Sequence, residues 1–577
     1  RDKTMLGNHR NHALWTFVAL WMAYLSNGGL TPAPDSAPNM QLALSLLHDG
    51  DMTFTPEEAP LLFHWQIRVD SQTRDVDLAT FDHGMAALMA QGKLEVKEGR
   101  YLVVPSVYPG TYVSTFPMGT ALVALPFLGI VEPFTGDLRA QSATLWISAK
   151  VFSAACVAAA AVFLFLTNCR FTSSGLALLL TWAFGLGTAV WTTSSQGLWQ
   201  HGPTELFLSA AFYFMTDPRH VARNAALTGF CLGAATLCRP TSGLFVVAVG
   251  LYFLWTCRPA LLLFITAGLP FAIALFSYNA SLLGNPWVFG ETNVVGHALE
   301  KTGNASMFAT PLWTGASVAL FSPSRGLFVF SPFLAFSFLA VPRIWREATL
   351  KRLRPWTVGV LGVWLVQFVY FDYWGGWTFG NRTLVDTTPM LALFLSTVIA
   401  DLWQFRGARM LFLACVAWSV MIQAMGAFIY DTAGWNNRRA FEVQAAGADR
   451  PMRFFDEHQA KLQREQGAQV TELFLDIDKP ENRDRLWSIP DSQILYYLTR
   501  LGESRRRRAE FADFFTRSRS TILADDYVRM ANGFWELRDP ITARTCLKRA
   551  LESSPENPAA DQLLRQWELS NDSTDEP

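Results

Sequence analysis

Charged residues are scarce in this chain. Lys, Arg, Asp and Glu make up 16% of its 577 residues and hydrophobic residues 51%, whereas a typical soluble chain is about 25% charged. This deficit argues against an ordinary soluble protein and indicates a membrane protein. The net charge of −1 is also far from the basic excess that neutralises phosphates. We therefore predict no nucleic-acid partner.

Cysteine pairs with a functional spacing are also missing. Five of the seven cysteines lie inside apolar runs, one lies just beyond such a run, and only Cys546 lies in the polar tail. No pair has the spacing of a zinc site or a disulfide framework. We interpret the cysteines as small apolar core residues and predict no metal site from them.

Long apolar runs, by contrast, are abundant. A span needs about 20 residues to cross roughly 30 Å of hydrocarbon. We count eleven candidate runs between His12 and Tyr430, several of them shorter than this length. A further run at 119–134 is interrupted by Pro126 and Pro133, so it either crosses or lies at the surface as a juxtamembrane helix. Because no small-residue cleavage site follows the first run, we expect a retained span rather than a signal peptide.

Basic residues in the connectors set the expected orientation. The linker 342–355 carries five Lys and Arg residues, and further arginines occur at 170, 219, 223, 406 and 409. All of them fall on the side of the basic N-terminus only if 119–134 does not cross. We therefore predict an all-α polytopic protein with about eleven transmembrane helices, an N-terminus in the cytoplasm and a C-terminus outside. Twelve spans are the weaker alternative.

This topology divides the chain into two domains. Residues 1–430 form the membrane domain, with a first outer loop at 31–141 that we expect to hold a small hairpin around 93–104. Residues 431–577 are charged and are expected to form a mostly helical soluble domain outside. Small, bulky and Pro positions at 527–558 match a tetratricopeptide-like hairpin. An ordinary two-helix terminus explains that pattern equally well.

The first outer loop begins with the stretch TPAPDSAPNM. Pro32, Pro34 and Pro38 prevent a helix from running straight through it, which fixes Asp35 within a few residues of a span. A carboxylate held at the bilayer surface is a candidate catalytic group. The alternative is that Asp35 or Ser36 only caps the helix that follows.

Other outer loops carry arginine, histidine and tryptophan. His201, Arg239, Arg325 and Arg382 all lie at span ends on this predicted side. Several arginines at one membrane face suit an anionic head group, since guanidinium binds phosphate oxygens bidentately. Each arginine is also explained by a local ion pair, such as Arg382 with Asp386. Trp374 and Trp377 are candidates to stack on a sugar, although interfacial anchoring explains them too.

Together these motifs resemble the GT-C glycosyltransferases, polytopic enzymes that take a sugar from a polyprenyl-phosphate carrier outside the cytoplasmic membrane. The resemblance rests on the acidic residue after the first span, LCRPT, YNASLLGNPW, SPSRGLFVFSP and WGGWTFGNR. It covers roughly residues 11–430 and concerns the bacterial members, which implies the inner membrane. The family often has two acidic residues in the first loop, whereas Ser36 follows Asp35 here. Asp49 or Asp51 could supply the second, so a divalent metal cofactor stays open.

The resemblance implies a mechanism. Asp35 would act as the base that deprotonates the hydroxyl of a polysaccharide, glycolipid or protein acceptor. Arg325, Arg382, Arg239 and His201 would hold the phosphate of the polyprenyl-phosphate-linked sugar, and Trp374, Trp377 and Tyr278 would contact the sugar or acceptor. Because the phosphate leaves as a stable anion, arginines replace the acid that glycosidases need. Direct attack inverts the anomeric centre.

Two alternative functions would predict other sequence features. A lipid or polysaccharide transporter, or flippase, needs ionisable residues at mid-depth of broken helices. The runs here are nearly free of them, which favours a reaction at the membrane surface. A membrane-anchored scaffold would leave the long loop between two early spans unexplained.

Overall fold

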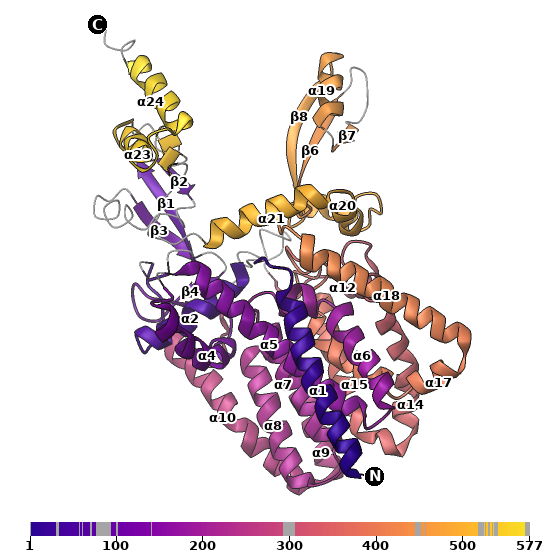
Figure 1. Ribbon diagram of the computed structural model, residues 1–577. Helices are drawn as coiled ribbons and strands as arrows, with labels where there is room; N and C mark the ends of the chain where they lie inside the picture. The colour runs from indigo at the N-terminus through magenta and orange to yellow at the C-terminus, as the bar shows by residue number, and fades with distance from the viewer. Residues whose placement is uncertain are drawn as a thin grey trace.

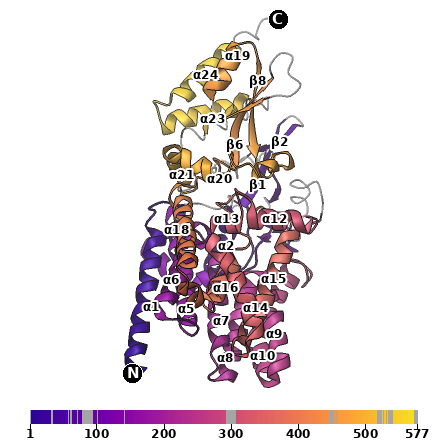
Figure 2. The same cartoon turned by 90° about the vertical axis from the view of Figure 1, so that its right-hand side faces the viewer.

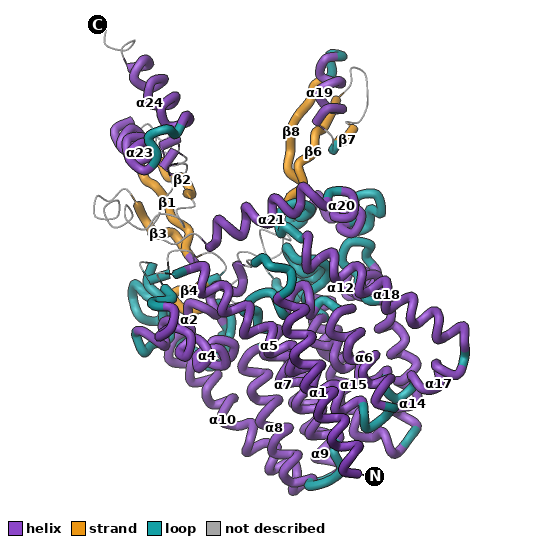
Figure 3. The backbone as a smooth tube through the Cα atoms, viewed as in Figure 1, coloured by secondary structure: helices purple, strands orange, loops and turns teal. Residues whose placement is uncertain are grey.

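The computed structural model describes residues 2–30, 34–56, 58–59, 62–69, 72–76, 94–99, 102–139, 141–291, 306–444, 452–455, 457–516, 540–571 and six positions between 524 and 535. Most of the described residues are helical and form one bundle, with the strands gathered at one end of it (Figure 3). The N-terminus lies at the opposite end (Figure 1). We call the end with the strands the upper end and the other the lower end.

The bundle forms from the apolar runs of the sequence. Four helices are long and apolar enough to cross a membrane: α5 (Ser142–Asn168), α8 (Val221–Cys238), α10 (Arg258–Leu282) and α18 (Arg406–Ile429). The others are α1 (Asp2–Leu25), α6 (Ser174–Gly187), α7 (His201–Thr216), α9 (Gly243–Thr256), α12 (Leu312–Phe321), α13 (Leu327–Phe330), α14 (Ala340–Arg346), α15 (Arg354–Val369), α16 (Thr388–Leu395) and α17 (Ile399–Gln404). Short turns of helix join them: η3 (Val190–Ser194), η4 (Pro240–Ser242), η6 (Pro332–Leu339), η7 (Ala348–Leu353) and η8 (Val385–Thr387). The count of eleven spans stays a prediction.

Glycines let neighbouring helices approach closely. A Cβ atom on Gly229 of α8 would lie 2.1 Å from the carbonyl oxygen of Phe264 in α10, and one on Gly315 of α12 would lie 1.8 Å from that of Phe368 in α15. No other residue fits at these crossings. Such small-residue contacts are typical of helix packing in membranes, where apolar burial alone does not hold helices together.

The basic connectors meet at the lower end. Arg352 donates to the carbonyl of Asp217 (2.6 Å) and that of Met215 (3.0 Å). Arg170 lies 3.9 Å from the Asp217 carboxylate, and Arg343 pairs with Asp401 at 2.5 Å. Connectors far apart in sequence therefore share one face, as the predicted arrangement requires.

The first loop forms a small layer above the bundle, and its strands depart from the all-α prediction, although the described chain is mostly helical. It contains η1 (Pro34–Ser36), α2 (Ala37–His48), β1 (Phe63–Val69), β2 (Gln72–Val76), β3 (Leu94–Gly99), β4 (Val103–Pro105), β5 (Tyr112–Ser114) and α4 (Gly119–Thr135). The strands form a three-stranded antiparallel sheet of order β2-β1-β3 and a β4-β5 pair. Among the described residues of 93–104, β3 pairs with β1 and β4 pairs with β5, so these two strands do not form the expected hairpin with each other. Helix α4 packs on α2 and against the upper part of the bundle (Figure 1).

The C-terminal segment adds a second sheet and several helices. Its elements are β6 (Asn437–Gln444), β7 (Met452–Phe454), α19 (Glu457–Glu465), β8 (Gln469–Asp476), η9 (Pro480–Leu486), α20 (Gln493–Thr499), α21 (Leu501–Thr516), α23 (Pro540–Ser553) and α24 (Pro558–Asn571). The sheet has the order β7-β6-β8. The tetratricopeptide-like hairpin at 527–558 lies partly outside the described residues and stays a prediction, although its buried positions Ala531, Ala543, Leu547 and Ala550 are each 0% exposed.

The C-terminal segment packs directly on the bundle (Figure 2). Trp435 and Tyr497 share one apolar cluster with Phe330 and Trp374 of the preceding part of the chain. From α21, the buried Arg508 donates to the carbonyl of Ala427, where α18 ends, at 2.5 Å. Packing is therefore continuous across residue 430, the boundary expected between two domains.

Candidate active site

Asp35 lies in the turn η1, at the upper end of the bundle. The turn leads into α2, where Ser36 occupies the N-cap position and its side chain makes no capping hydrogen bond. Asp35 is 9% exposed and its Oδ2 accepts a hydrogen bond from Nη1 of Arg382, 347 residues away. Asp35 therefore has a long-range ion-pair partner, which a simple helix-capping role does not account for.

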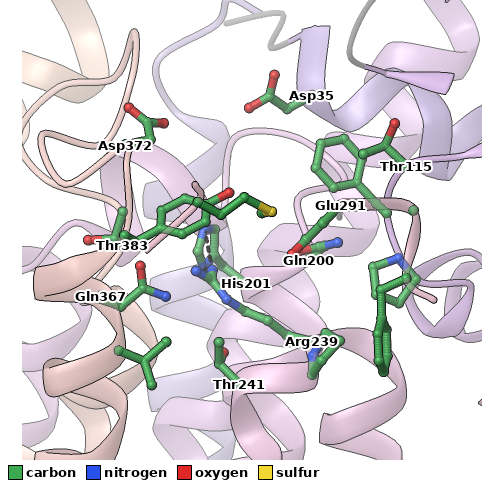
Figure 4. Close-up of a pocket in the computed structure, with 18 of the residues that line it drawn as sticks. Asp35, Thr115, Gln200, His201, Arg239, Thr241, Glu291, Gln367, Asp372 and Thr383 are labelled. Atoms are coloured by element: carbon green, nitrogen blue, oxygen red, sulfur yellow. Dashed lines mark hydrogen bonds between the residues drawn. The ribbon is translucent and has the colours of Figure 1, made fainter. Parts of the chain in front are cut away.

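A cavity of about 380 Å³ opens beside this ion pair. Its walls come from the first loop, the starts or ends of α7, α8, α10 and α15, and the loops at 289–291, 307–308 and 372–383. Five of the eight predicted site residues line it: Asp35, His201, Arg239, Tyr278 and Arg382. Figure 4 shows Asp35 and Asp372 on the upper side of the cavity, with His201 and Arg239 below them.

Arg382 is held between two carboxylates and an aromatic ring. Besides pairing with Asp35, its Nη2 lies 3.8 Å from Oδ2 of Asp372, and its Cζ lies 4.8 Å from the ring centroid of Trp199. The loop turns tightly here through Gly376, whose φ is +64°. A Cβ on Gly376 would lie 3.2 Å from Asp372 Oδ2 and 3.5 Å from Arg382 Nη2, so glycine leaves room for both groups.

His201, Arg239 and Asp386 form a buried charged group on the lower side of the cavity. Nδ1 of His201 lies 2.8 Å from Oδ1 of Asp386, and Nη1 of Arg239 lies 3.1 Å from Oδ2 of Asp386. Nη1 of Arg239 also lies 2.6 Å from Nδ1 and 3.0 Å from Nε2 of His201. A proton on Nδ1 can bond to Asp386, which leaves Nε2 as the ring nitrogen that accepts from Arg239. His201 thus orients Arg239, and the suggested Arg382–Asp386 pair is wrong because each residue has a different partner.

Arg325, Trp374 and Trp377 do not line the cavity, so the structure does not bring them together with the other predicted residues. Arg325 is 0% exposed, and its guanidinium donates to the carbonyls of Gly376 (3.0 Å) and Gly380 (3.2 Å). Trp374 is also 0% exposed, and its Nε1 donates to Asp478 at 3.0 Å. Trp377 packs on the same apolar cluster as Trp374. These residues face the C-terminal segment instead.

Several cavity residues were missing from the predicted site. Trp199, Glu291 and Asp372 are the most informative of them. Burial raises the pKa of Glu291, and the charges of Arg239 and Arg382 oppose this rise. Asp372 begins the loop that also contains Arg382, so the motif around Arg382 could have indicated Asp372 as a site residue. Glu291 lies in the outer loop after α10 and had no such signal.

The carboxylates of the cavity are the candidates for holding a metal ion. Asp35, Glu291 and Asp372 face the same space, and divalent cations such as Mg²⁺ prefer carboxylate oxygens. Within the described ranges, the single group of three metal-capable side chains whose ligand atoms lie within 4.8 Å of one another is elsewhere: His48, Glu132 and Asp137. His48 is at the opposite end of α2 from Asp35, about 18 Å away along the helix.

Comparisons with known proteins give a likeness in structure. No protein-family model and no curated protein matches the chain. The apo crystal structure of the Archaeoglobus fulgidus oligosaccharyltransferase is similar at 11% sequence identity and a TM-score of 0.41, covering 92% of this chain and 72% of that chain. A TM-score at this level does not by itself establish a common fold.

Proposed function

We propose that this protein is a membrane glycosyltransferase that moves a sugar from a polyprenyl-phosphate donor to a polysaccharide, glycolipid or protein acceptor. The observation that supports this best is the Asp35–Arg382 pair at the wall of a cavity at the upper end of an apolar helical bundle. A carboxylate and a guanidinium are the two groups that the reaction needs, one for the acceptor proton and one for the leaving phosphate.

The chemical step follows from this placement. The acceptor oxygen attacks the anomeric carbon while the bond from that carbon to the phosphate oxygen breaks, and polyprenyl phosphate leaves with the bonding electrons. Asp35 takes the acceptor proton, and Arg382 stabilises the phosphate anion. Since Arg382 pairs with Asp35 in this structure, the donor phosphate must compete for it. Donor binding would then turn Asp35 toward the acceptor, and the single displacement inverts the anomeric centre.

Arg239 is the second phosphate contact in this proposal. Asp386 and His201 fix its position through Nη1, and its guanidinium lines the cavity. The sugar would lie beside Tyr278, which also lines the cavity. Arg325, Trp374 and Trp377 are left out of substrate binding because their contacts lie outside the cavity.

The charge balance of the cavity bears on the open question of a metal. Three carboxylates line it, from Asp35, Glu291 and Asp372, against two guanidiniums. Phosphate binding would add further negative charge. As placed, the ligand oxygens of these three carboxylates do not all lie within 4.8 Å of one another, so they would have to move closer to hold a divalent cation, which when bound would neutralise charge on the leaving phosphate. Loss of turnover in a chelator, with recovery on adding Mg²⁺ or Mn²⁺, tests this assignment.

The apolar part of the cavity wall would receive the start of the polyprenyl chain. It includes Leu244, Leu275, Phe289, Met307, Phe308 and Val366. The adjoining α10 is largely exposed, with Leu262, Ile265, Leu269 and Ile273 between 48% and 64% exposed. Lipid would cover this face in a bilayer.

The lower end is assigned to the cytoplasm. Arg170, Arg343 and Arg352 gather there, and positive connectors stay inside. The cavity and residues 431–577 would then lie outside, in the periplasm of a bacterium whose inner membrane holds the bundle. The cavity would then lie on the periplasmic side of the membrane, where a lipid carrier presents its sugar.

A transporter or flippase is the alternative function. The bundle does contain buried ionisable residues, notably Lys150 and Glu205, which are 5% and 0% exposed. Lys150 donates to Asn27 and Gly29 at the top of α1, and Glu205 lies one turn into α7 from His201. Both therefore lie near the upper end rather than at mid-depth, which favours a reaction over alternating access.

Turnover by the purified protein tests the proposal. With a polyprenyl-phosphate sugar and an acceptor, the wild type should release free polyprenyl phosphate, and Asp35→Asn should abolish the release. Asp401→Asn is a matched control, since Asp401 is an exposed carboxylate at the lower end. Turnover that is equal in Asp35→Asn and the wild type would refute the assignment of the base.

A further inference from the structure

The loop at 372–383 has two different faces. Its ends carry Asp372 and Arg382, which line the cavity. Its middle, from Gly376 to Gly380, lies against the C-terminal segment instead, where the side chain of Gln493, more than 100 residues later in sequence, contacts its backbone. The position of Arg382 is thus set partly by contacts outside the cavity.

Gln493, the first residue of α20, makes the most complete of these contacts. Its side chain is 0% exposed. Oε1 accepts from the backbone N–H of Gly380 at 2.8 Å and from Nη1 of Arg325 at 3.3 Å, and Nε2 donates to the carbonyl of Thr378 at 2.9 Å. Both ends of the amide are therefore used, and both act on backbone groups within four residues of Arg382.

Gln493 is itself firmly placed. Its backbone N–H donates to Oγ of Ser324 at 3.3 Å, and Ser492 caps α20 by accepting from the N–H of Leu495 at 3.4 Å. Arg325 links the same loop to Asn436, whose Oδ1 accepts from Nη2 at 2.5 Å. The hydrogen bonds to the loop thus link it to the packed interior of the C-terminal segment.

We propose that Gln493 is a positioning residue of the candidate active site: by holding the backbone at Thr378 and Gly380, it keeps Arg382 directed at Asp35 and the cavity. This role rests on the proposed function, because it acts through the phosphate contact assigned to Arg382. It also gives residues 431–500 a part in the reaction.

The expected effect follows from the geometry. A buried neutral hydrogen bond contributes on the order of a tenfold change in a local opening equilibrium. A displacement of about 1 Å at a reacting group can lower turnover up to about a hundredfold. Gln493→Met keeps the length and an unbranched side chain but removes all three hydrogen bonds. Gln493→Glu keeps the acceptor for Gly380 and Arg325, so it should retain more activity than Gln493→Met.

Two measurements on the full chain in detergent or lipid test the proposal. Hydrogen exchange of the peptide 376–383 reports the loop directly, and release of polyprenyl phosphate per mole of folded protein reports the reaction. Leu498→Met is the matched control, since Leu498 lies on the same helix and is 55% exposed. For Gln493→Met we expect exchange about tenfold faster and turnover about tenfold to a hundredfold lower, with Gln493→Glu closer to the wild type.

Exchange at 376–383 that is unchanged in Gln493→Met would overturn the proposal. Unchanged turnover per folded molecule, despite faster exchange, would also overturn it. If the wild type released no polyprenyl phosphate from any sugar donor, the proposed function would fail, and the exchange rates would still decide whether Gln493 holds the loop.

Discussion

Replacing Arg382 by lysine keeps a positive charge beside Asp35 but removes the planar pair of donors that a phosphate or carboxylate accepts. The guanidinium side chain is 19% exposed, so solvent screens its contacts only weakly. One lost charge-assisted hydrogen bond to the leaving phosphate is worth about 1.5–3 kcal/mol, which corresponds to a fall in turnover of about tenfold to a hundredfold. Arg382→Met removes both donors and the charge, so we expect a fall of about 10² to 10⁴.

Stability has to be separated from chemistry in this experiment. Removing one partner of a buried ion pair costs about 3 kcal/mol, because the other charge is left without compensation. Arg382→Met should therefore also unfold at lower temperature, whereas Arg382→Lys should not differ much from the wild type. Initial rates of polyprenyl phosphate release are measured at saturating acceptor over a range of donor concentrations, on protein shown to be folded by size-exclusion chromatography and thermal unfolding.

Arg343→Lys provides the matched control for the lysine variant. Arg343 pairs with Asp401 and Glu347 at the lower end and is 36% exposed. Its replacement should change neither rate nor donor KM. If folded Arg382→Lys and Arg382→Met both kept rates within about twofold of the wild type, Arg382 would not contact the phosphate in the transition state.

Three further predictions concern the surroundings of this pair. Asp386→Asn leaves the buried Arg239 charge uncompensated, so we expect a loss of about 3 kcal/mol in stability, seen as a lower unfolding temperature, together with reduced turnover; an unchanged unfolding temperature would contradict the pairing. Gly376→Ala introduces a Cβ at positive φ, costing about 1–2 kcal/mol, and crowds Asp372 and Arg382, whereas Gly50→Ala has a similar φ of +74° with nothing within 4 Å. Turnover should fall only in the former, and equal effects on rate would count against the close approach. Burial raises the folded-state pKa of Glu291, so the stability linked to its neutral form is complete below the ordinary value of 4.5 and is lost as pH rises through the folded pKa. Glu291→Gln should therefore unfold at a higher temperature than the wild type near neutral pH but not at pH 4, and the same difference at both pH values would argue against the raised pKa.

The sequence was a good guide to residues at the ends of apolar runs. Asp35, His201, Arg239 and Arg382 were grouped because charges beside a span are costly unless they are paired or functional. The folded chain does bring them to one cavity, together with Tyr278. The reason is simple: residues at similar depth on one side of a bundle lie in one layer, whatever their separation in sequence.

The orientation of side chains within that layer was beyond sequence reasoning. Trp374 belongs to the same motif as Arg382, and Arg325 was predicted to act beside them, yet the partners of Arg325 and Trp374, Gln493 and Asp478, come more than 100 residues later. Nothing in the local pattern indicates that those partners exist. The same holds for Arg382 and Asp386, which are four residues apart. Arg382 pairs with Asp35, whereas Asp386 pairs with His201 and Arg239.

The pairing of the strands could not be predicted for a related reason. Strand β1 pairs with β2 and with β3, which lies about 25 residues further along the chain, and β6 pairs with β8 across α19. Strand pairing depends on such distant partners more than on local propensity. Apolar helices satisfy their own backbone hydrogen bonds, so the bundle could be anticipated from local sequence.

A structure with a bound, non-transferable analogue of a polyprenyl-phosphate sugar would show whether the cavity is the site of sugar transfer. We expect the phosphate within hydrogen-bonding distance of Arg382 and Arg239, the sugar in the cavity beside Tyr278, and a carboxylate oxygen of Asp35 no longer paired with Arg382. A phosphate bound elsewhere on the protein, with the Asp35–Arg382 pair intact and the cavity empty of sugar, would contradict it.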